Sequence, residues 1–79
     1  MSNNFERVQE IISQQLGIET SKIRINSNFG EELGADSLDL VELVMVIENE
    51  FDLEADDRIA SEIETVQDAL NYIDYIQRN

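Results

Sequence analysis

Apolar residues recur at helical spacing in three stretches of the chain, separated by stretches without a clear period. The first stretch begins at Asn3, and Glu6 is the partner that a capping box requires three residues later. Gly17 is a natural end, because glycine readily adopts the left-handed conformation that often follows a helix. The spacing therefore predicts a first helix from Asn3 to about Gly17. Its apolar face contains Phe5, Val8, Ile11, Ile12 and Leu16.

Residues 18–35 form a long connection in which apolar residues are scattered without a period. An unstructured loop of this length is unusual in a compact domain. We expect a short helical turn near Thr20 to Ile23, and apolar side chains that hold the loop against the core. These side chains are Ile18, Ile23, Ile25, Phe29 and Leu33. A strand at residues 22–26 is an alternative, but it would have no partner strand.

The second helical stretch begins at Asp36 or Ser37 and runs to about Phe51. Asp36 is a favourable N-cap residue, and Asp39 takes the third helical position. Both carboxylates then lie where unpaired N–H groups and the helix dipole favour negative charge. The polar start and the apolar run behind it predict a helix with a well-defined first turn.

A short helical turn is expected around Asp57 to Glu62, ahead of the last helix. Thr65 caps that helix, with Asp68 as a weak capping-box partner. Its apolar stripe contains Val66, Ala69, Leu70, Ile73 and Ile76. Three long helices, one short helix and a long first connection predict an all-α fold, a small antiparallel four-helix bundle. We expect one domain over residues 1–79.

The second helix carries more apolar residues than one buried stripe needs. At about 100° per residue, its core side is a narrow arc formed by Leu40, Leu43, Val44, Ile47 and Phe51. A second stripe, centred roughly 130° away by the same rule, consists of Leu38, Val41 and Met45, with Glu42 and Glu48 on either side. One interpretation is that this stripe only widens the buried face. The other is an exposed apolar strip with acidic edges, suited to a helix or groove on a partner.

The charge balance narrows the range of partners. Eighteen acidic and five basic residues give the 79-residue chain a net charge of −13. Nucleic acid and anionic membrane surfaces are excluded as partners, because both require a basic footprint. Partners with basic patches are favoured instead. The simpler alternative is that the acidic residues only keep a small protein in solution.

Several absences limit the chemistry and the location that we expect. The chain has no cysteine, which excludes disulfides and thiolate metal sites. The acidic segment DLEADDRIASEI, residues 52–63, has Asp57 and Ile63 where an EF-hand requires glycine and glutamate. No apolar run is long enough to span a membrane, and the N-terminus has no signal-peptide pattern. We therefore expect a cytoplasmic monomer with no membrane insertion and no metal site.

Ser37, in the segment GADSLDLVEL, is the candidate for chemistry. A serine nucleophile needs a neighbouring base, but the chain has no histidine, and its single lysine, Lys22, is not close in sequence. We therefore expect Ser37 to be modified by another enzyme, and we do not expect this chain to be an enzyme. A phosphate at this helix start would be favoured by the dipole and the free N–H groups. Because Asp36 and Asp39 oppose further negative charge, a phosphodiester is easier to accommodate than a phosphomonoester.

A strong resemblance to the acyl carrier proteins of bacterial type II fatty-acid synthesis lies in LGADSLDLVELVMVIENEF, residues 33–51. It extends over nearly the whole chain, from ERVQEIISQQLG to ETVQDALNYI. The resemblance implies that Ser37 receives a 4′-phosphopantetheine arm from coenzyme A, and that acyl chains are carried on the arm as thioesters. It also implies the partners: a phosphopantetheinyl transferase, and fatty-acid synthesis enzymes and acyltransferases with basic docking patches.

The resemblance assigns further residues position by position. The acidic recognition helix of the family matches Asp36, Asp39, Glu42 and Glu48, with Leu38, Val41 and Met45 as its exposed apolar contacts. Positions near the acyl cavity of the family match Phe29, Ile47, Ala60, Ile63 and Ala69. Ordinary core packing would explain these five residues equally well.

The segment after Phe51 departs from the family pattern. Ala55 and Asp56 stand where the family usually has an Ile-Pro pair, and the smaller Ala55 implies a wider pocket or looser packing. Arg58 falls where the family tends to have an acidic residue. Two alternatives to a fatty-acid carrier stay open. One is a specialised carrier for an aminoacyl or polyketide intermediate, and the other is an unmodified acidic helical module that binds other proteins.

Overall fold

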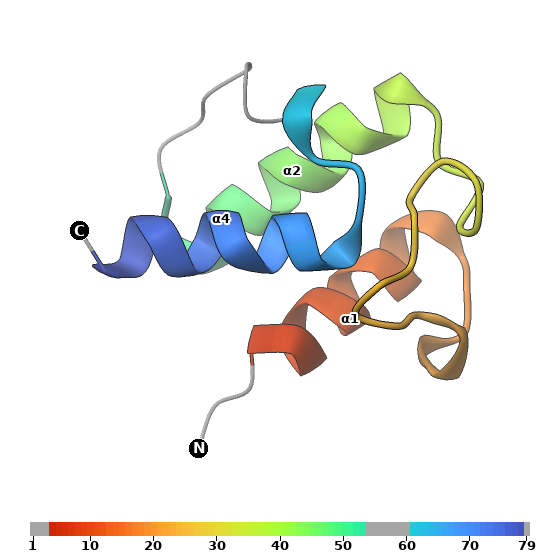
Figure 1. Ribbon diagram of the computed structural model, residues 1–79, viewed down its shortest axis with the longest axis horizontal. Helices are drawn as coiled ribbons and strands as arrows, with labels where there is room; N and C mark the ends of the chain where they lie inside the picture. Colours follow the sequence, from red (N-terminus) through yellow and green to blue (C-terminus); the bar gives the residue numbers. More distant parts are fainter. Residues whose placement is uncertain (1–3, 54–60, 79) are drawn as a thin grey trace.

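The structure is a computed structural model that describes residues 4–53 and 61–78 (Figure 1). In chain order these residues form helix α1 (Asn4–Leu16), the 3-10 turn η1 (Thr20–Lys22), helix α2 (Ser37–Phe51) and helix α4 (Val66–Arg78). The described part of the chain contains no strand. The all-α prediction is confirmed, and the arrangement is consistent with a four-helix bundle. The expected short helix at residues 57–62 falls mostly outside the described residues, although Ser61 and Glu62 have helical backbone.

The helices begin and end where local sequence signals place them. Gly17 follows α1 with a φ of 69° and donates a 2.9 Å hydrogen bond from its N–H to the carbonyl of Ser13. The expected start of α1 at Asn3 lies outside the described residues. At the start of α4, the N–H of Asp68 donates to Thr65 Oγ1 at 3.2 Å, and the N–H of Thr65 donates to Asp68 Oδ2 at 3.1 Å. The predicted capping box of the last helix is confirmed.

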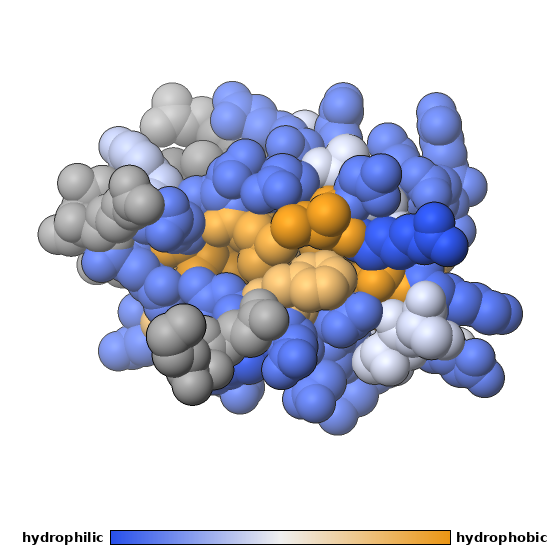
Figure 2. Space-filling view, turned by 60° about the horizontal axis from the view of Figure 1, so that its bottom comes forward, coloured by the Kyte–Doolittle hydropathy of each residue, from blue (hydrophilic) through white to orange (hydrophobic). Residues whose placement is uncertain are grey.

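The core lies where α1 packs against both α2 and α4. Each helix contributes side chains that are almost completely buried: Val8 and Ile12 from α1, Leu43 and Ile47 from α2, and Val66 and Ile73 from α4. All six belong to the apolar faces that helical spacing predicts. Half-buried residues such as Phe5, Leu70 and Ile76 pack around this core. Figure 2 shows one face of the molecule, on which hydrophilic residues surround a central band of hydrophobic residues.

The long first connection is held against the core by its apolar side chains. Ile23, Phe29 and Leu33 are buried as expected, but Ile25 is 45% exposed, so its assignment to the core is wrong. Ile25 lies at the tip of a turn that is closed by a 3.0 Å hydrogen bond from the N–H of Ser27 to the carbonyl of Arg24. A residue at the tip of such a turn points away from the loop's packed side.

A strand-like contact joins this connection to the start of α4. Asn28 and Thr65 form an isolated antiparallel bridge. On either side of it, the N–H of Phe29 donates to the carbonyl of Glu64 at 2.9 Å, and the N–H of Val66 donates to the carbonyl of Ser27 at 3.0 Å. The strand considered at residues 22–26 does not form, but these bonds fix the loop that leads toward α2.

Candidate functional site

Ser37 is the first residue of α2, and its side chain is exposed. Asp36 before it is the N-cap, with extended backbone. The N–H of Asp39 donates to Asp36 Oδ1 at 2.8 Å, and the N–H of Asp36 donates to Asp39 Oδ2 at 3.2 Å. This reciprocal capping box uses both carboxylates to satisfy helix N–H groups. It therefore holds Ser37 at a fixed and accessible position.

The loop ahead of Ser37 fixes the start of α2 against the core. Leu33 and Ala35 are both 8% exposed, and the N–H of Ala35 donates a 2.8 Å hydrogen bond to the carbonyl of Phe29. Between them, Gly34 has a φ of 72°, a conformation that strains other residues. With Ala35 fixed against the core, Ser37 emerges at the surface.

The start of α2 suits a singly charged phosphate on Ser37. Within the part of the chain that the structure describes, the backbone N–H groups of Ser37 and Leu38 have no hydrogen-bond acceptor. Such N–H groups, together with the helix dipole, favour an anion. The carboxylates of Asp36 and Asp39 accept hydrogen bonds from the backbone and still carry negative charge, which disfavours a doubly charged group. The residues present therefore fit a phosphodiester.

The second apolar stripe of α2 is exposed. The exposed fractions of Leu38, Val41 and Met45 are 71%, 45% and 60%. Glu42 is also exposed and lies beside this strip. The interpretation that the stripe only widens the buried face is therefore wrong. We call Leu38, Val41 and Met45 the α2 strip.

Glu48 does not lie where the sequence pattern placed it. Its side chain is 5% exposed, and it accepts a 2.9 Å hydrogen bond from the hydroxyl of Tyr72 in α4. At about 100° per residue, Glu48 falls between the α2 strip and the core arc. Tyr72 reaches across from α4 and covers this edge of α2. The expectation of an exposed acidic edge at Glu48 is therefore corrected, whereas Glu42 is accessible on the other edge.

The residues matched to an acyl cavity are buried as far as the structure describes them. Phe29, Ile47, Ile63 and Ala69 are each at most 5% exposed, and they come from the first connection, α2, the segment before α4, and α4. Ala60 lies outside the described residues, as do Ala55, Asp56 and Arg58. Burial agrees both with a cavity and with ordinary packing, so the acyl pocket stays a prediction.

Tyr72 is a buried residue of α4 that helical spacing did not single out. It is 8% exposed and lies at the edge of the apolar stripe of α4, directly before Ile73 in the sequence. A tyrosine next to such a stripe is the available sequence signal, because a buried phenol needs a hydrogen-bond partner. Its partner, Glu48, is 24 residues away in sequence.

No group of three or more metal-ligating side chains is found among residues 4–53 and 61–78. Over the same residues, no helix is long and apolar enough to cross a membrane.

Comparisons with known proteins give one consistent answer. The model of the family described as "Phosphopantetheine attachment site" matches residues 6–73. An acyl carrier protein of Phaeodactylum tricornutum is 58% identical over 74 residues, which cover 94% of this chain and 97% of that protein. The acyl carrier protein of Cylindrotheca sp. is 51% identical, over 94% of this chain and 92% of its own length. The acyl carrier protein of Clostridium acetobutylicum is also 51% identical, over 87% of this chain and 90% of its own length.

The match covers most of the chain, and the relatives are matched over nearly their full length. The segment that carries the resemblance also has the geometry described above, with an exposed serine at a capped helix start and an apolar strip behind it. The chain therefore belongs to the acyl carrier protein family: it is a carrier with a phosphopantetheine attachment site, not an enzyme.

Proposed function

We propose that Ser37 is the attachment residue, and that the protein carries acyl chains between the enzymes of fatty-acid synthesis. The observation that carries this proposal is the position of Ser37, exposed as the first residue of a helix whose cap is fixed on both sides. When bound, the 4′-phosphopantetheine arm supplies the thiol that the chain lacks, and acyl groups are held on it as thioesters.

The attachment step asks little of the carrier itself. A P–O bond forms to Ser37 Oγ and the pyrophosphate bond of coenzyme A breaks, so that the nucleotide half leaves. The hydroxyl proton passes to a base, which we place on the transferase because the carboxylates next to Ser37 already accept hydrogen bonds in the capping box. The chain contributes an accessible hydroxyl and two backbone N–H groups that favour the resulting phosphodiester.

We further propose that partner enzymes bind the α2 strip. The partners are a phosphopantetheinyl transferase, and fatty-acid synthesis enzymes and acyltransferases with basic patches. Exposed apolar side chains edged by charge are suited to a docking surface, and acidic residues such as Glu42 attract a basic partner before contact. The strip begins next to Ser37, so an enzyme bound there would have the modified serine at the edge of its contact.

Two further proposals concern the cargo site and the compartment. The interior around Phe29, Ile47, Ile63 and Ala69 is proposed to shelter the acyl chain, because these buried apolar residues belong to one core cluster. Ala60, which the resemblance adds to this set, lies outside the described residues. A cytoplasmic location, expected from the sequence, stays a prediction.

Intact-mass measurement tests the attachment residue. The chain is incubated with coenzyme A and a broad-specificity phosphopantetheinyl transferase. We expect one phosphopantetheine per chain for the unmodified sequence and none for Ser37→Ala. Ser21→Ala is the matched control, because Ser21 is also exposed but lies in η1, and it should load fully. Loading of folded Ser37→Ala would show that another residue takes the arm.

A further inference from the structure

The first turn of α2 is not anchored by buried side chains of its own. Ser37 and Leu38 are exposed, and the first buried residue of α2 is Leu43. The capping box joins Asp36 to Asp39 within the same turn, so it shapes the turn without attaching it to the rest of the protein. The place of Ser37 relative to the core therefore depends on the loop that precedes it.

Asn28 organises this loop through its side chain and its backbone. Its Oδ1 accepts hydrogen bonds from the N–H groups of Gly30 and Glu31, at 3.0 and 2.9 Å. Its carbonyl accepts from the N–H groups of Glu32 and Leu33, at 3.0 and 3.1 Å, and its own N–H donates to Glu32 Oε1 at 3.1 Å. The hydrogen bonds that form this turn, the Asn28 turn, therefore meet at one half-buried residue.

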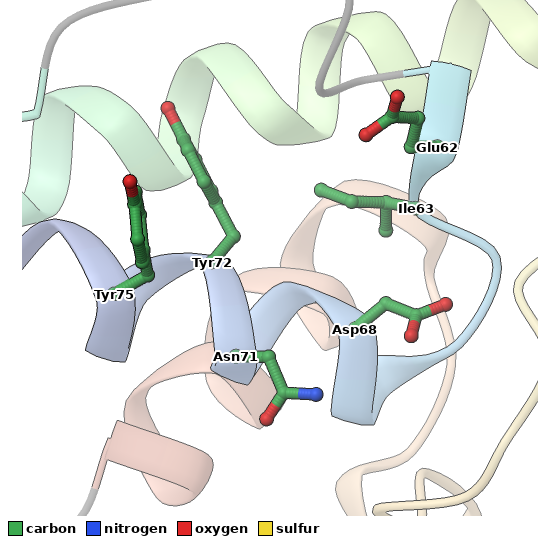
Figure 3. Close-up of a pocket in the computed structure, with 6 residues that line it drawn as sticks. All are labelled: Glu62, Ile63, Asp68, Asn71, Tyr72 and Tyr75. Carbon is green, nitrogen blue, oxygen red and sulfur yellow. The ribbon is translucent and has the colours of Figure 1, made fainter.

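The Asn28 turn is attached to the start of α4 on one side and to the approach to Ser37 on the other. The N–H of Phe29 donates to the carbonyl of Glu64 at 2.9 Å, and the carbonyl of Phe29 accepts from the N–H of Ala35 at 2.8 Å. Glu64 is itself held by Asp68, whose Oδ2 accepts its N–H at 3.0 Å. Figure 3 shows the Asp68 carboxylate in the first turn of α4, directed away from the tyrosine rings and toward the segment before the helix. A continuous series of contacts therefore joins α4 to the residue before the N-cap of α2.

An asparagine side chain suits the centre of this turn. It is short, and it places a carbonyl oxygen where backbone N–H groups two and three residues later can reach it. Aspartate offers an oxygen at the same distance, serine offers a weaker acceptor, and alanine offers none. Gly30 and Glu31 are exposed, so water can replace a lost acceptor. Loss of the Asn28 amide oxygen would therefore loosen the turn more than it would destabilise the whole domain.

We propose that Asn28 is a positioning residue for the modification of Ser37. This inference rests on the proposed function, in which Ser37 is the attachment residue. A partner on the α2 strip contacts Met45, in the part of α2 that Leu43 and Val44 anchor, whereas Ser37 lies in the first turn. The Asn28 turn fixes one relative to the other. A displacement of about 1 Å at a reacting atom can lower a rate about a hundredfold, so this constraint bears directly on loading.

Steady-state kinetics of loading test the proposal, with coenzyme A, a broad-specificity phosphopantetheinyl transferase and the full chain at varied concentration. Asn28→Ala should lower kcat about tenfold and leave the KM for the carrier within about twofold, because the α2 strip is unchanged. Asn28→Asp keeps the acceptor and should retain the parent kcat, and Asn28→Ser should lie between the two. If circular dichroism shows that Asn28→Ala does not fold, Asn28→Ser carries the same test.

Two further measurements separate positioning from stability. Tyr72→Phe removes a buried hydrogen bond between α2 and α4, outside the loop, and should lower stability without changing kcat. In NMR spectra of the unloaded ¹⁵N-labelled chain, Asn28→Ala should shift the amide signals of Ser37 and Asp39 while that of Ile73 stays in place. Asn28→Asp should leave all three signals near their parent positions.

The proposal is overturned if Asn28→Ala loads with the parent kcat, if Asn28→Asp loads as slowly as Asn28→Ala, or if only KM changes. It is also overturned if Tyr72→Phe lowers kcat by the same factor, or if the amide signals of Ser37 and Asp39 do not move in Asn28→Ala. Failure of the proposed function would look different, because Ser37→Ala would then load like the parent, whichever residue stands at position 28.

Discussion

The hydroxyl of Tyr72 in α4 donates a 2.9 Å hydrogen bond to the carboxylate of Glu48 in α2, and both side chains are more than nine-tenths buried. A buried carboxylate is unfavourable unless it is hydrogen-bonded, and a bond to a charged acceptor is stronger than a neutral one. This hydrogen bond therefore joins α2, which carries the α2 strip, to α4.

Loss of the Tyr72 hydroxyl should destabilise the fold. Tyr72→Phe keeps the ring but removes a donor from a buried carboxylate, so the free energy of unfolding should fall by about 1–3 kcal/mol. Chemical denaturation measures the change. Tyr75→Phe is the matched control on the same helix: that ring is 67% exposed, and its effect should stay within about 0.5 kcal/mol. Equal stability of the two variants would mean that the buried bond contributes nothing net.

The capping box at Asp36 should be worth a measurable part of the stability. Asp36→Ala removes the acceptor for the N–H of Asp39 and should lower the free energy of unfolding by about 1 kcal/mol. For a domain of this size that is a fall in the melting temperature of about 4–8 °C. Asp36→Asn removes the same charge but keeps a good cap, so its melting temperature should stay near that of the parent. If both variants melt alike, charge rather than capping is responsible.

The charge of Glu42, beside the α2 strip, should govern how fast partners bind. Glu42→Lys places a cation beside the strip and should slow the loading of Ser37, more at low salt than at high salt, because salt screens exposed charges. Stopped-flow or initial-rate assays of loading measure the effect. Glu6→Lys makes the same charge change at an exposed position of α1 and should have a much smaller effect. Equal slowing by both reversals would indicate that only the net charge matters.

The α2 strip itself should govern how long partners stay bound. Met45 is 60% exposed, so Met45→Ala should leave the fold intact while removing contact area from the docked complex. We expect faster dissociation with little change in the salt dependence of binding, because no charge is altered. Surface plasmon resonance with an elongation enzyme separates the two rates. A changed association rate with an unchanged dissociation rate would argue against this division of roles.

Repulsion among the acidic residues should limit stability. A net charge of −13 on 79 residues favours expansion of the chain, and about 0.3 M sodium chloride shortens the range of that repulsion to a few ångströms. The melting temperature should therefore rise with sodium chloride. Chloride is preferred to sulfate here, because sulfate also strengthens hydrophobic burial. A melting temperature that is indifferent to salt would show that the acidic charges are already compensated locally.

The sequence by itself determined the features that depend on near neighbours. The bounds of α2, the capping box of Asp36 and Asp39, and the angular separation of the α2 strip from the core side all follow from residues within one or two helical turns. Hydrogen bonds of helix caps and the angular spacing of side chains are local properties, so they can be predicted before the fold is known. The family resemblance then added the chemical role expected of Ser37, which no local pattern specifies.

Only the tertiary structure decided which edge of α2 is covered. Glu42 and Glu48 both flank the strip by helical spacing, yet Glu42 is exposed and Glu48 is buried beneath Tyr72. The difference arises because Tyr72 of α4 covers one edge of α2. This contact joins two residues that are 24 positions apart in the sequence. The bridge between Asn28 and Thr65 has the same origin. Long-range packing sets the environment of a side chain, whereas its angle on the helix is set by the chain alone.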